Sequence, residues 1–160
     1  MIFLNLMYNM EIILTEGCIC DSLVIDGKES SKCTSEELLS VIRKILYKES
    51  SKFNLINFLD QVIDIFSDYA SFVGDSCKYG RFLISFDENE DIIVNNKYIK
   101  DFNEDEIRDI IIEIINSGKN QDNLVWTLRG LVQIYGKYKF CYHCDECGDA
   151  VVEYKLKLSS

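Results

Sequence analysis

The sequence predicts an α+β fold, with a mainly antiparallel sheet and about four helices in a single domain spanning residues 1–160. The length of 160 residues is usual for one domain, and 48% of the residues are apolar, which is enough for a sizeable core. Segments with strand and helix periodicity come in blocks: strands, two helices, strands, two helices and a final strand. No convincing sequence repeat is visible, although the two strand–helix–helix halves are roughly alike in layout.

Strands are expected first, at residues 11–15 and 21–25, because both segments are rich in β-branched residues. Asp26-Gly27 then indicates a turn, since both residues tolerate a positive φ. Residues 28–33 are polar and are expected to form a loop.

Two helices are expected next. Thr34 can cap the first, and Glu37, three residues later, completes a capping box; this helix is expected to end near Lys48. The second is expected to begin near Ser51 and to end at Gly74, which enters the left-handed conformation without a steric penalty.

The second half of the chain begins with strands predicted at 81–86 and 91–94, joined by the acidic turn 87–90. Asn95-Asn96 indicates another tight turn, before a short strand at 97–99. The pattern therefore predicts antiparallel pairing in this part of the chain as well.

The remaining segments are two helices and a strand. A helix from Asn103 to Gly118 has a capping box completed by Glu106, and another is expected at about 122–135. Residues 150–158 alternate between apolar and charged, which is typical of a half-buried strand.

The chain is strongly acidic, with 27 acidic and 17 basic residues and a net charge of −10. This charge argues against nucleic acid or an anionic membrane as a partner, because binding to phosphates needs clustered Lys and Arg. It would instead attract a basic protein surface, although the alternative is that it only keeps the protein in solution. With no basic leader and no apolar run of about 18 residues, a cytoplasmic protein is expected.

Three acidic segments are the candidate partner-binding surfaces. They are one face of the second helix, the turn between two strands and the start of the third helix: Asp60, Asp64 and Asp68; Asp87, Glu88 and Glu90; and Glu104, Asp105 and Asp109. For each, the alternative interpretation is an ordinary solvated face or turn.

Cysteines offer a candidate metal site. Cys144-x-x-Cys147-Gly has the spacing of a zinc knuckle, and Cys18-x-Cys20 could supply two further thiolates to a closed structural zinc site. The simpler interpretation, which we favour, is that no metal is bound and that the cysteines are reduced thiols.

The other cysteines and the single histidine suggest no catalytic centre. Cys33 and Cys77 are expected in the core, since cysteine packs as a small apolar residue. Cys141 and His143 are spare metal-ligand candidates. The chain has no Walker A loop, no Rossmann glycine fingerprint and no nucleophile elbow, so we expect a binding protein and not an enzyme.

Two cysteine-containing segments together resemble those of small bacterial proteins: Gly17-Cys18-x-Cys20-Asp21-Ser22-Leu23 with Asp26-Gly27-Lys28-Glu29, and Cys144-x-x-Cys147-Gly148-Asp149 before a strand with Tyr154. The short, acidic chain without a catalytic motif also resembles the immunity proteins of contact-dependent growth inhibition systems. That resemblance implies a protein that binds and neutralises a cognate toxin, often a basic nuclease, through an acidic surface. The alternative function is a zinc-stabilised binding or adaptor module.

Overall fold

The computed structural model describes residues 9–17, 21–48, 51–66, 76–143, 145, 148 and 150–159, with the backbone alone for 139–142. These residues form four α-helices and two antiparallel sheets, one of five strands and one of four. The predicted α+β class, antiparallel pairing and four helices are confirmed, but the strands are divided between two sheets.

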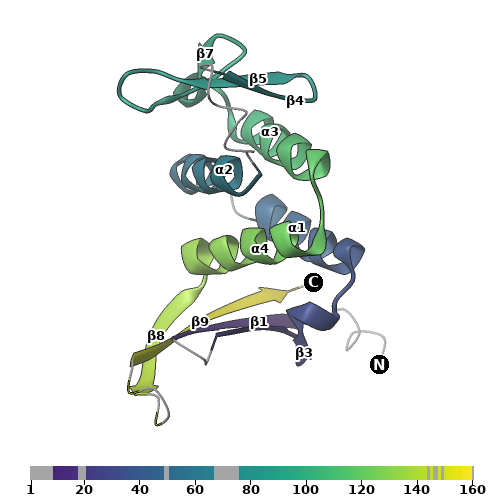
Figure 1. The fold of residues 1–160 in the computed structure, drawn as a ribbon, viewed down its shortest axis with the longest axis vertical. Helices are drawn as coiled ribbons and strands as arrows, with labels where there is room; N and C mark the ends of the chain where they lie inside the picture. Colours follow the sequence, from purple (N-terminus) through teal and green to yellow (C-terminus); the bar gives the residue numbers. More distant parts are fainter. Residues whose placement is uncertain are drawn as a thin grey trace. The chain divides into compact units, whose positions relative to one another are not determined.

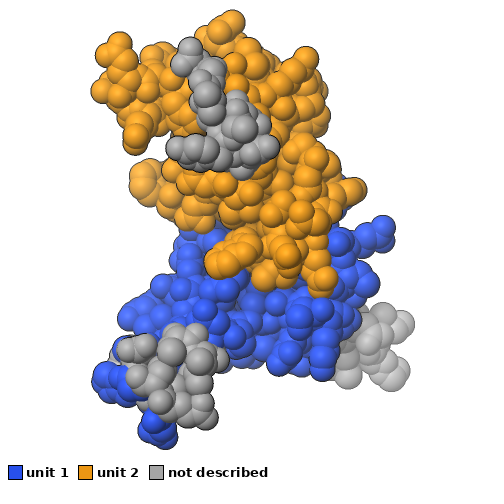
Figure 2. Space-filling view, in the orientation of Figure 1, with its two compact units in different colours: residues 1–45, 128–160 blue, residues 46–127 orange. Residues whose placement is uncertain are grey.

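The chain divides into two compact units, which are coloured separately in Figure 2. Unit 1 comprises residues 1–45 and 128–160, and unit 2 comprises residues 46–127. The boundaries fall inside two helices, α1 (Ser35–Lys48) and α4 (Gln121–Tyr135). The expectation of a single domain over the whole chain stays a prediction.

Unit 1 contains the five-stranded sheet, in the order β3-β2-β1-β9-β8. Its strands are β1 (Asn9–Glu16), β2 (Ser22–Ile25), β3 (Lys28–Glu29), β8 (Lys137–His143) and β9 (Ala150–Ser159). Most of α1 and the second half of α4 lie over one face of this sheet (Figure 1). Ile12 and Leu14 of β1 point into the core and are fully buried, as the period of two along a strand requires.

Unit 2 contains the four-stranded sheet, in the order β4-β5-β6-β7. Its strands are β4 (Ser76–Tyr79), β5 (Phe82–Phe86), β6 (Ile92–Val94) and β7 (Lys97–Tyr98). The helices α2 (Lys52–Phe66) and α3 (Glu104–Ser117) pack against each other, and α3 also contacts β4 (Figure 1). Five isoleucines of α3 recur at helical spacing and are fully buried: Ile107, Ile110, Ile111, Ile114 and Ile115.

The two halves of the chain repeat one arrangement of elements, which we call copy 1 and copy 2. In copy 1 a short strand, a 3₁₀ turn and two helices begin at Lys28, Ser30, Ser35 and Lys52; in copy 2 they begin at Lys97, Ile99, Glu104 and Gln121. Each pair of starting residues differs by 69 positions. The structure therefore corrects the sequence-based conclusion that the chain holds no convincing repeat.

The turn that precedes each short strand is held by the same hydrogen bonds in both copies. In copy 1 the Asp26 amide donates to the Glu11 carbonyl at 2.8 Å, and Asp26 Oδ1 accepts from the Glu11 amide at 2.8 Å. In copy 2 Asn95 makes both bonds with Leu83, each at 2.8 Å. Asp26 and Asn95 both have a positive φ, of 49° and 50°. The two copies therefore match atom by atom at this turn.

Both predicted capping boxes are confirmed, at equivalent places. The Glu37 amide donates to Thr34 Oγ1 at 3.1 Å, and Glu37 Oε1 accepts from the Thr34 amide at 3.1 Å. Asn103 and Glu106 make the same pair of bonds at 2.8 and 3.0 Å. These reciprocal bonds satisfy amide donors that a helix start otherwise leaves unpaired.

Each unit combines helices of both copies. Unit 1 holds most of α1, from copy 1, and the second half of α4, from copy 2; unit 2 holds α3, from copy 2, and α2, from copy 1. Each sheet is thus accompanied by the first helix of its own copy and the second helix of the other.

Some sequence expectations were wrong or lie outside the described residues. Residues 28–33 are not a loop throughout, because Lys28–Glu29 pair with β2 and residues 30–32 form a 3₁₀ turn. The predicted stop of α2 at Gly74 lies outside the described residues. No helix within the described ranges is long and apolar enough to cross a membrane.

Candidate functional site

The negative charge is concentrated in unit 2. Residues 46–127 include 16 acidic and 8 basic residues, a net charge of −8, whereas unit 1 has 11 acidic and 9 basic residues, a net charge of −2. All nine predicted partner-binding residues belong to unit 2. A basic partner attracted by this chain would therefore experience the strongest field at unit 2.

Two of the candidate segments meet in one acidic face, which we define as Asp60, Asp64 and Glu90. Asp60 and Asp64 are exposed and one turn apart on α2, and Glu90 is exposed in the turn between β5 and β6. The pKa of Asp60 is raised, first by partial removal of its carboxylate from water and then by the charges of Asp64 and Glu90. This coupling between residues 30 positions apart shows that the helix and the turn share one electrostatic environment.

Asp87 holds the turn in shape. Its Oδ1 accepts hydrogen bonds from the amides of Asn89 and Asp91, both at 2.9 Å, and its Oδ2 accepts one from the Tyr98 hydroxyl at 3.1 Å. The bond from the Asp91 amide is the main reason that the pKa of Asp87 is lowered, with Tyr98 and Asn89 adding to it. Asp87 therefore positions the turn that exposes its neighbour Glu88 to solvent.

At the start of α3, Asp105 is paired with a cation. Arg108 is buried, and its Nη1 donates to Asp105 Oδ1 at 2.8 Å while its Nε donates to the Leu46 carbonyl at 2.8 Å. The carboxylate of Asp105 is thus partly neutralised by Arg108, which also holds the backbone of α1.

The other two candidate residues of this segment, Asp109 and Glu104, also lie close to positive charge. Asp109 lies 4.0 Å from Arg81 Nη2, with both side chains more than half exposed. Glu104 is half-buried in the first turn of α3, where a carboxylate suits the positive end of the helix dipole. The start of α3 is therefore a weaker candidate for binding a cationic partner than the acidic face.

Unit 2 also exposes large apolar side chains. Phe53 is 79% exposed, and Tyr98 bonds to Asp87 beside the acidic turn. Exposed aromatic residues are enriched at the centres of protein interfaces, where they supply most of the apolar contact. Among the described residues of unit 2, the large exposed apolar side chains are Tyr47, Phe53, Leu83, Tyr98 and Trp126.

The predicted metal ligands are not among the described residues, nor is one predicted acidic residue: Cys18, Cys20, Cys144 and Cys147, and Asp68. Within the described part of the chain, no three His, Cys, Asp or Glu side chains could hold a metal ion together. Cys33 is buried, as predicted, whereas Cys77 in β4 is only half-buried. The zinc site stays a prediction.

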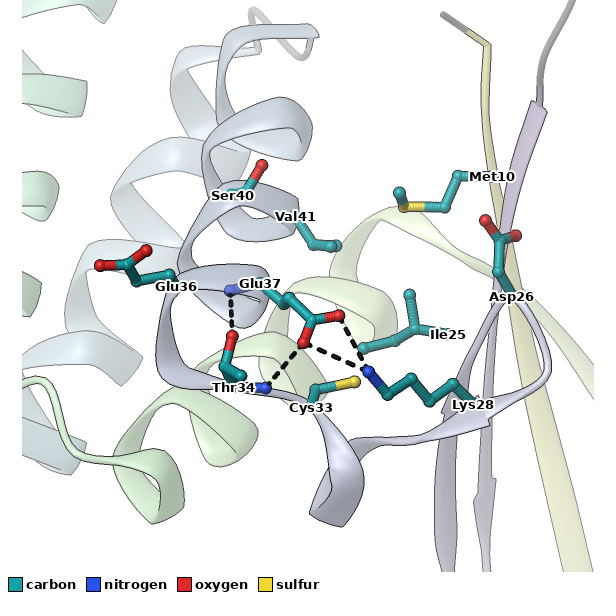
Figure 3. Close-up of a pocket in the computed structure, with 10 residues that line it drawn as sticks. All are labelled: Met10, Ile25, Asp26, Lys28, Cys33, Thr34, Glu36, Glu37, Ser40 and Val41. Atoms are coloured by element: carbon teal, nitrogen blue, oxygen red, sulfur yellow. Dashed lines mark hydrogen bonds and ion pairs between the residues drawn. The ribbon is translucent and has the colours of Figure 1, made fainter.

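Unit 1 contains a pocket of about 510 Å³ beside the start of α1, with ten lining residues (Figure 3): Met10, Ile25, Asp26, Lys28, Cys33, Thr34, Glu36, Glu37, Ser40 and Val41. Lys28 Nζ donates to both carboxylate oxygens of Glu37, at 3.2 and 3.1 Å. Sequence reasoning missed this pocket, because its lining comes from β1, β2, β3 and α1.

The pocket offers binding contacts and no activated nucleophile. Burial raises the pKa of the Cys33 thiol, and the nearby carboxylate of Glu37 raises it further. The pKa of Glu37 is lowered, first by the hydrogen bond from the Thr34 amide and then by Lys28. At neutral pH the pocket therefore presents a neutral thiol and a closed ion pair.

No family model matches the chain, and neither the curated proteins nor the solved structures yield a match.

Proposed function

We propose that the chain is an immunity protein that neutralises a basic toxin by binding it through the acidic face of unit 2. The observation that carries the proposal is the raised pKa of Asp60, which is caused first by partial burial of its carboxylate and then by the nearby charges of Asp64 and Glu90. Both causes disfavour the charged form of Asp60, so the fold keeps this carboxylate charged at a cost in stability.

A cationic partner relieves that cost. Lys or Arg side chains set among the three carboxylates would replace repulsion with attraction, which favours the charged form of Asp60. The excess charge of unit 2 would also speed the encounter, over a range of about 8–10 Å at physiological salt. A toxin that acts on nucleic acid needs a basic surface of this kind to hold its substrate.

The exposed aromatic side chains of unit 2 supply the second contribution that a tight complex needs. Charge complementarity mainly sets the rate and specificity of association, whereas buried aromatic anchors provide most of the affinity. Phe53 and Trp126 are more than half exposed in the free chain, so a partner can still bury them.

The test compares two variants with the same change in net charge. One neutralises the acidic face, as Asp60→Asn, Asp64→Asn and Glu90→Gln; the control neutralises three acids of unit 1, as Glu29→Gln, Asp145→Asn and Glu153→Gln. Each tagged full-length chain is used to capture partners from its own host. A captured basic polypeptide is then expressed in cells with and without the chain, and growth is measured.

The proposal predicts that the polypeptide stops growth alone, and that the wild-type chain and the unit 1 variant restore growth. The variant of the acidic face should restore growth poorly. A captured partner that is harmless, or whose toxicity the wild-type chain does not relieve, would defeat the immunity function. Equal loss of rescue in both variants would defeat the assignment to the acidic face.

A further inference from the structure

The two copies differ at the pocket of unit 1. Cys33 lies 69 positions before Phe102, and each directly precedes the capping residue of a helix. Met10 corresponds to Phe82, because each directly precedes the residue that bonds to the equivalent turn, Glu11 or Leu83. Two positions that carry phenyl rings in copy 2 therefore carry a thiol and a thioether in copy 1.

In copy 2 the two equivalent positions carry buried rings. Phe82 and Phe102 are each only 8% exposed. Lys97 Nζ lies 4.6 Å from the centroid of the Phe102 ring, a distance suited to a cation–π interaction. Lys28 is the counterpart of Lys97 and lines the pocket of copy 1 (Figure 3).

The backbone that surrounds this position is the same in both copies, since the turn and the capping box are held by matching hydrogen bonds. The Cys33 side chain therefore starts along the direction that the Phe102 ring takes. The pocket of about 510 Å³ lies beside these two positions, where copy 1 has the smaller side chains of Cys33 and Met10. Its volume lies within the usual range for ligand pockets, about 300–1,000 Å³.

We propose that this pocket binds an aromatic side chain of a protein partner, which takes the place that Phe102 has in copy 2. The ring lies against Met10, Cys33 and Val41, and Lys28 packs over it as Lys97 packs over Phe102. The proposal does not rest on the immunity function, because the pocket belongs to unit 1 and the acidic face to unit 2.

The charged residues that line the pocket determine which residues can flank the partner's aromatic residue. Asp26, Glu36 and Glu37 line the pocket with carboxylates, and Lys28 is the one cation among the described residues that line it. When Lys28 turns toward a ring, the Glu37 carboxylate is left to pair with another cation. The fitting partner segment therefore carries Lys or Arg beside its aromatic residue.

The test uses the full-length chain, labelled with nitrogen-15, and three probes: acetyl-Lys-Phe-Lys-amide, acetyl-Lys-Ala-Lys-amide and free indole. Amide shifts are followed during titration of the wild type and of two variants. Cys33→Phe installs the residue of copy 2 and fills the pocket. Cys33→Ser removes the thiol and leaves the space, and therefore serves as the matched control.

We expect the Phe peptide to shift the amides of Met10, Cys33 and Val41 and to bind at least about tenfold more tightly than the Ala peptide. Cys33→Phe should weaken binding at least tenfold, whereas Cys33→Ser should leave it within about threefold of the wild type. A thermal melt checks that each variant is folded. If Cys33→Phe does not fold, Met10→Phe, the other residue of copy 2, takes its place with the same expected loss of binding.

Three results would overturn the proposal. The first is equal binding of the Phe and Ala peptides, or binding that the filled variant retains. The second is tighter binding of indole than of the Phe peptide, which would assign the pocket to a small molecule. The third is a set of nuclear Overhauser contacts from Phe3 or Tyr8 to Val41 in the free chain, which would assign the pocket to the chain's own N-terminal residues.

Discussion

Arg108 provides the sharpest test of how unit 2 is held together. Its Nε donates at 2.8 Å to the carbonyl of Leu46, which belongs to the last turn of α1. The last four carbonyls of a helix have no partner within it and carry the negative end of the helix dipole. The buried guanidinium therefore caps α1 and also pairs with Asp105 at 2.8 Å.

The cost of the substitution Arg108→Met follows from these two contacts. A hydrogen bond from a charged donor contributes about 1.5–3 kcal/mol, and losing it leaves the Leu46 carbonyl without this donor. The Asp105 side chain is 88% exposed, so its ion pair adds less than about 1 kcal/mol. Methionine keeps most of the apolar stem. We therefore expect Arg108→Met to lower the free energy of unfolding by about 2–3 kcal/mol.

The matched control is Asp105→Asn, which removes only the exposed ion pair and should cost less than about 1 kcal/mol. Urea unfolding followed by circular dichroism measures both variants, and a fall in Tm of roughly 5–10 °C is expected for Arg108→Met. Equal losses in the two variants, or a loss below about 0.5 kcal/mol for Arg108→Met, would refute the capping role.

Three further substitutions test the acidic face and the repeat. Asp60→Asn should raise the free energy of unfolding at pH 7, because a raised pKa in the folded chain means that the charged form destabilises it. Solvent screens this exposed group, so the gain should be no more than a few tenths of a kcal/mol. This gain should vanish as the pH falls below 3.8, the ordinary pKa of Asp60, because the carboxyl is then protonated in both the folded and the unfolded chain. Urea unfolding at pH 7 and at acid pH measures the gain. A gain that persists at acid pH would show that the electrostatic cause is wrong. Asn95→Ala removes the acceptor of the Leu83 amide at a residue with φ 50°, and should cost about 1–3 kcal/mol. Asp26→Ala removes the equivalent hydrogen bond from the Glu11 amide and should cost a similar amount in the same assay. A neutral effect of one of these two substitutions alone would contradict the equivalence of the two turns.

Local signals explain what the sequence could predict. Thr34 with Glu37, and Asn103 with Glu106, lie three residues apart and form their bonds within one helical turn, so the two helix starts were predictable. The turn at Asn95-Asn96 was predictable for the same reason, since both residues adopt a positive φ there.

Pairings between distant segments explain what the sequence could not predict. The strand at 76–79 was missed because it has only four residues. The strand at 137–143 has seven residues and three aromatic side chains, so a local signal for it was present and was overlooked. The place of both strands in their sheets is decided by partners elsewhere in the chain. The acidic face depends on α2 lying near the turn that contains Glu90, which no local pattern encodes. The repeat was missed because few identities remain, among them Lys28 with Lys97 and Glu37 with Glu106, while the backbone hydrogen bonds are preserved.

The pocket of unit 1 could not be predicted from the sequence for the same reason. Cys33 was correctly predicted to be buried, but its neighbours in space come from three strands and a helix. Only the alignment of the two copies shows that Phe102 occupies the matching position, and that alignment rests on hydrogen bonds seen in the structure.

The most direct test of the central claim is the dissociation constant of the chain with its captured toxin, measured by calorimetry at two salt concentrations. We expect the variant Asp60→Asn, Asp64→Asn and Glu90→Gln to bind at least about tenfold more weakly than the wild type, with a smaller further loss between about 0.05 and 0.5 M salt. The unit 1 control, Glu29→Gln, Asp145→Asn and Glu153→Gln, should bind within about threefold of the wild type. Equal affinities for the two variants, or a salt dependence that the acidic-face substitutions leave unchanged, would contradict the claim that unit 2 recognises the toxin through this face.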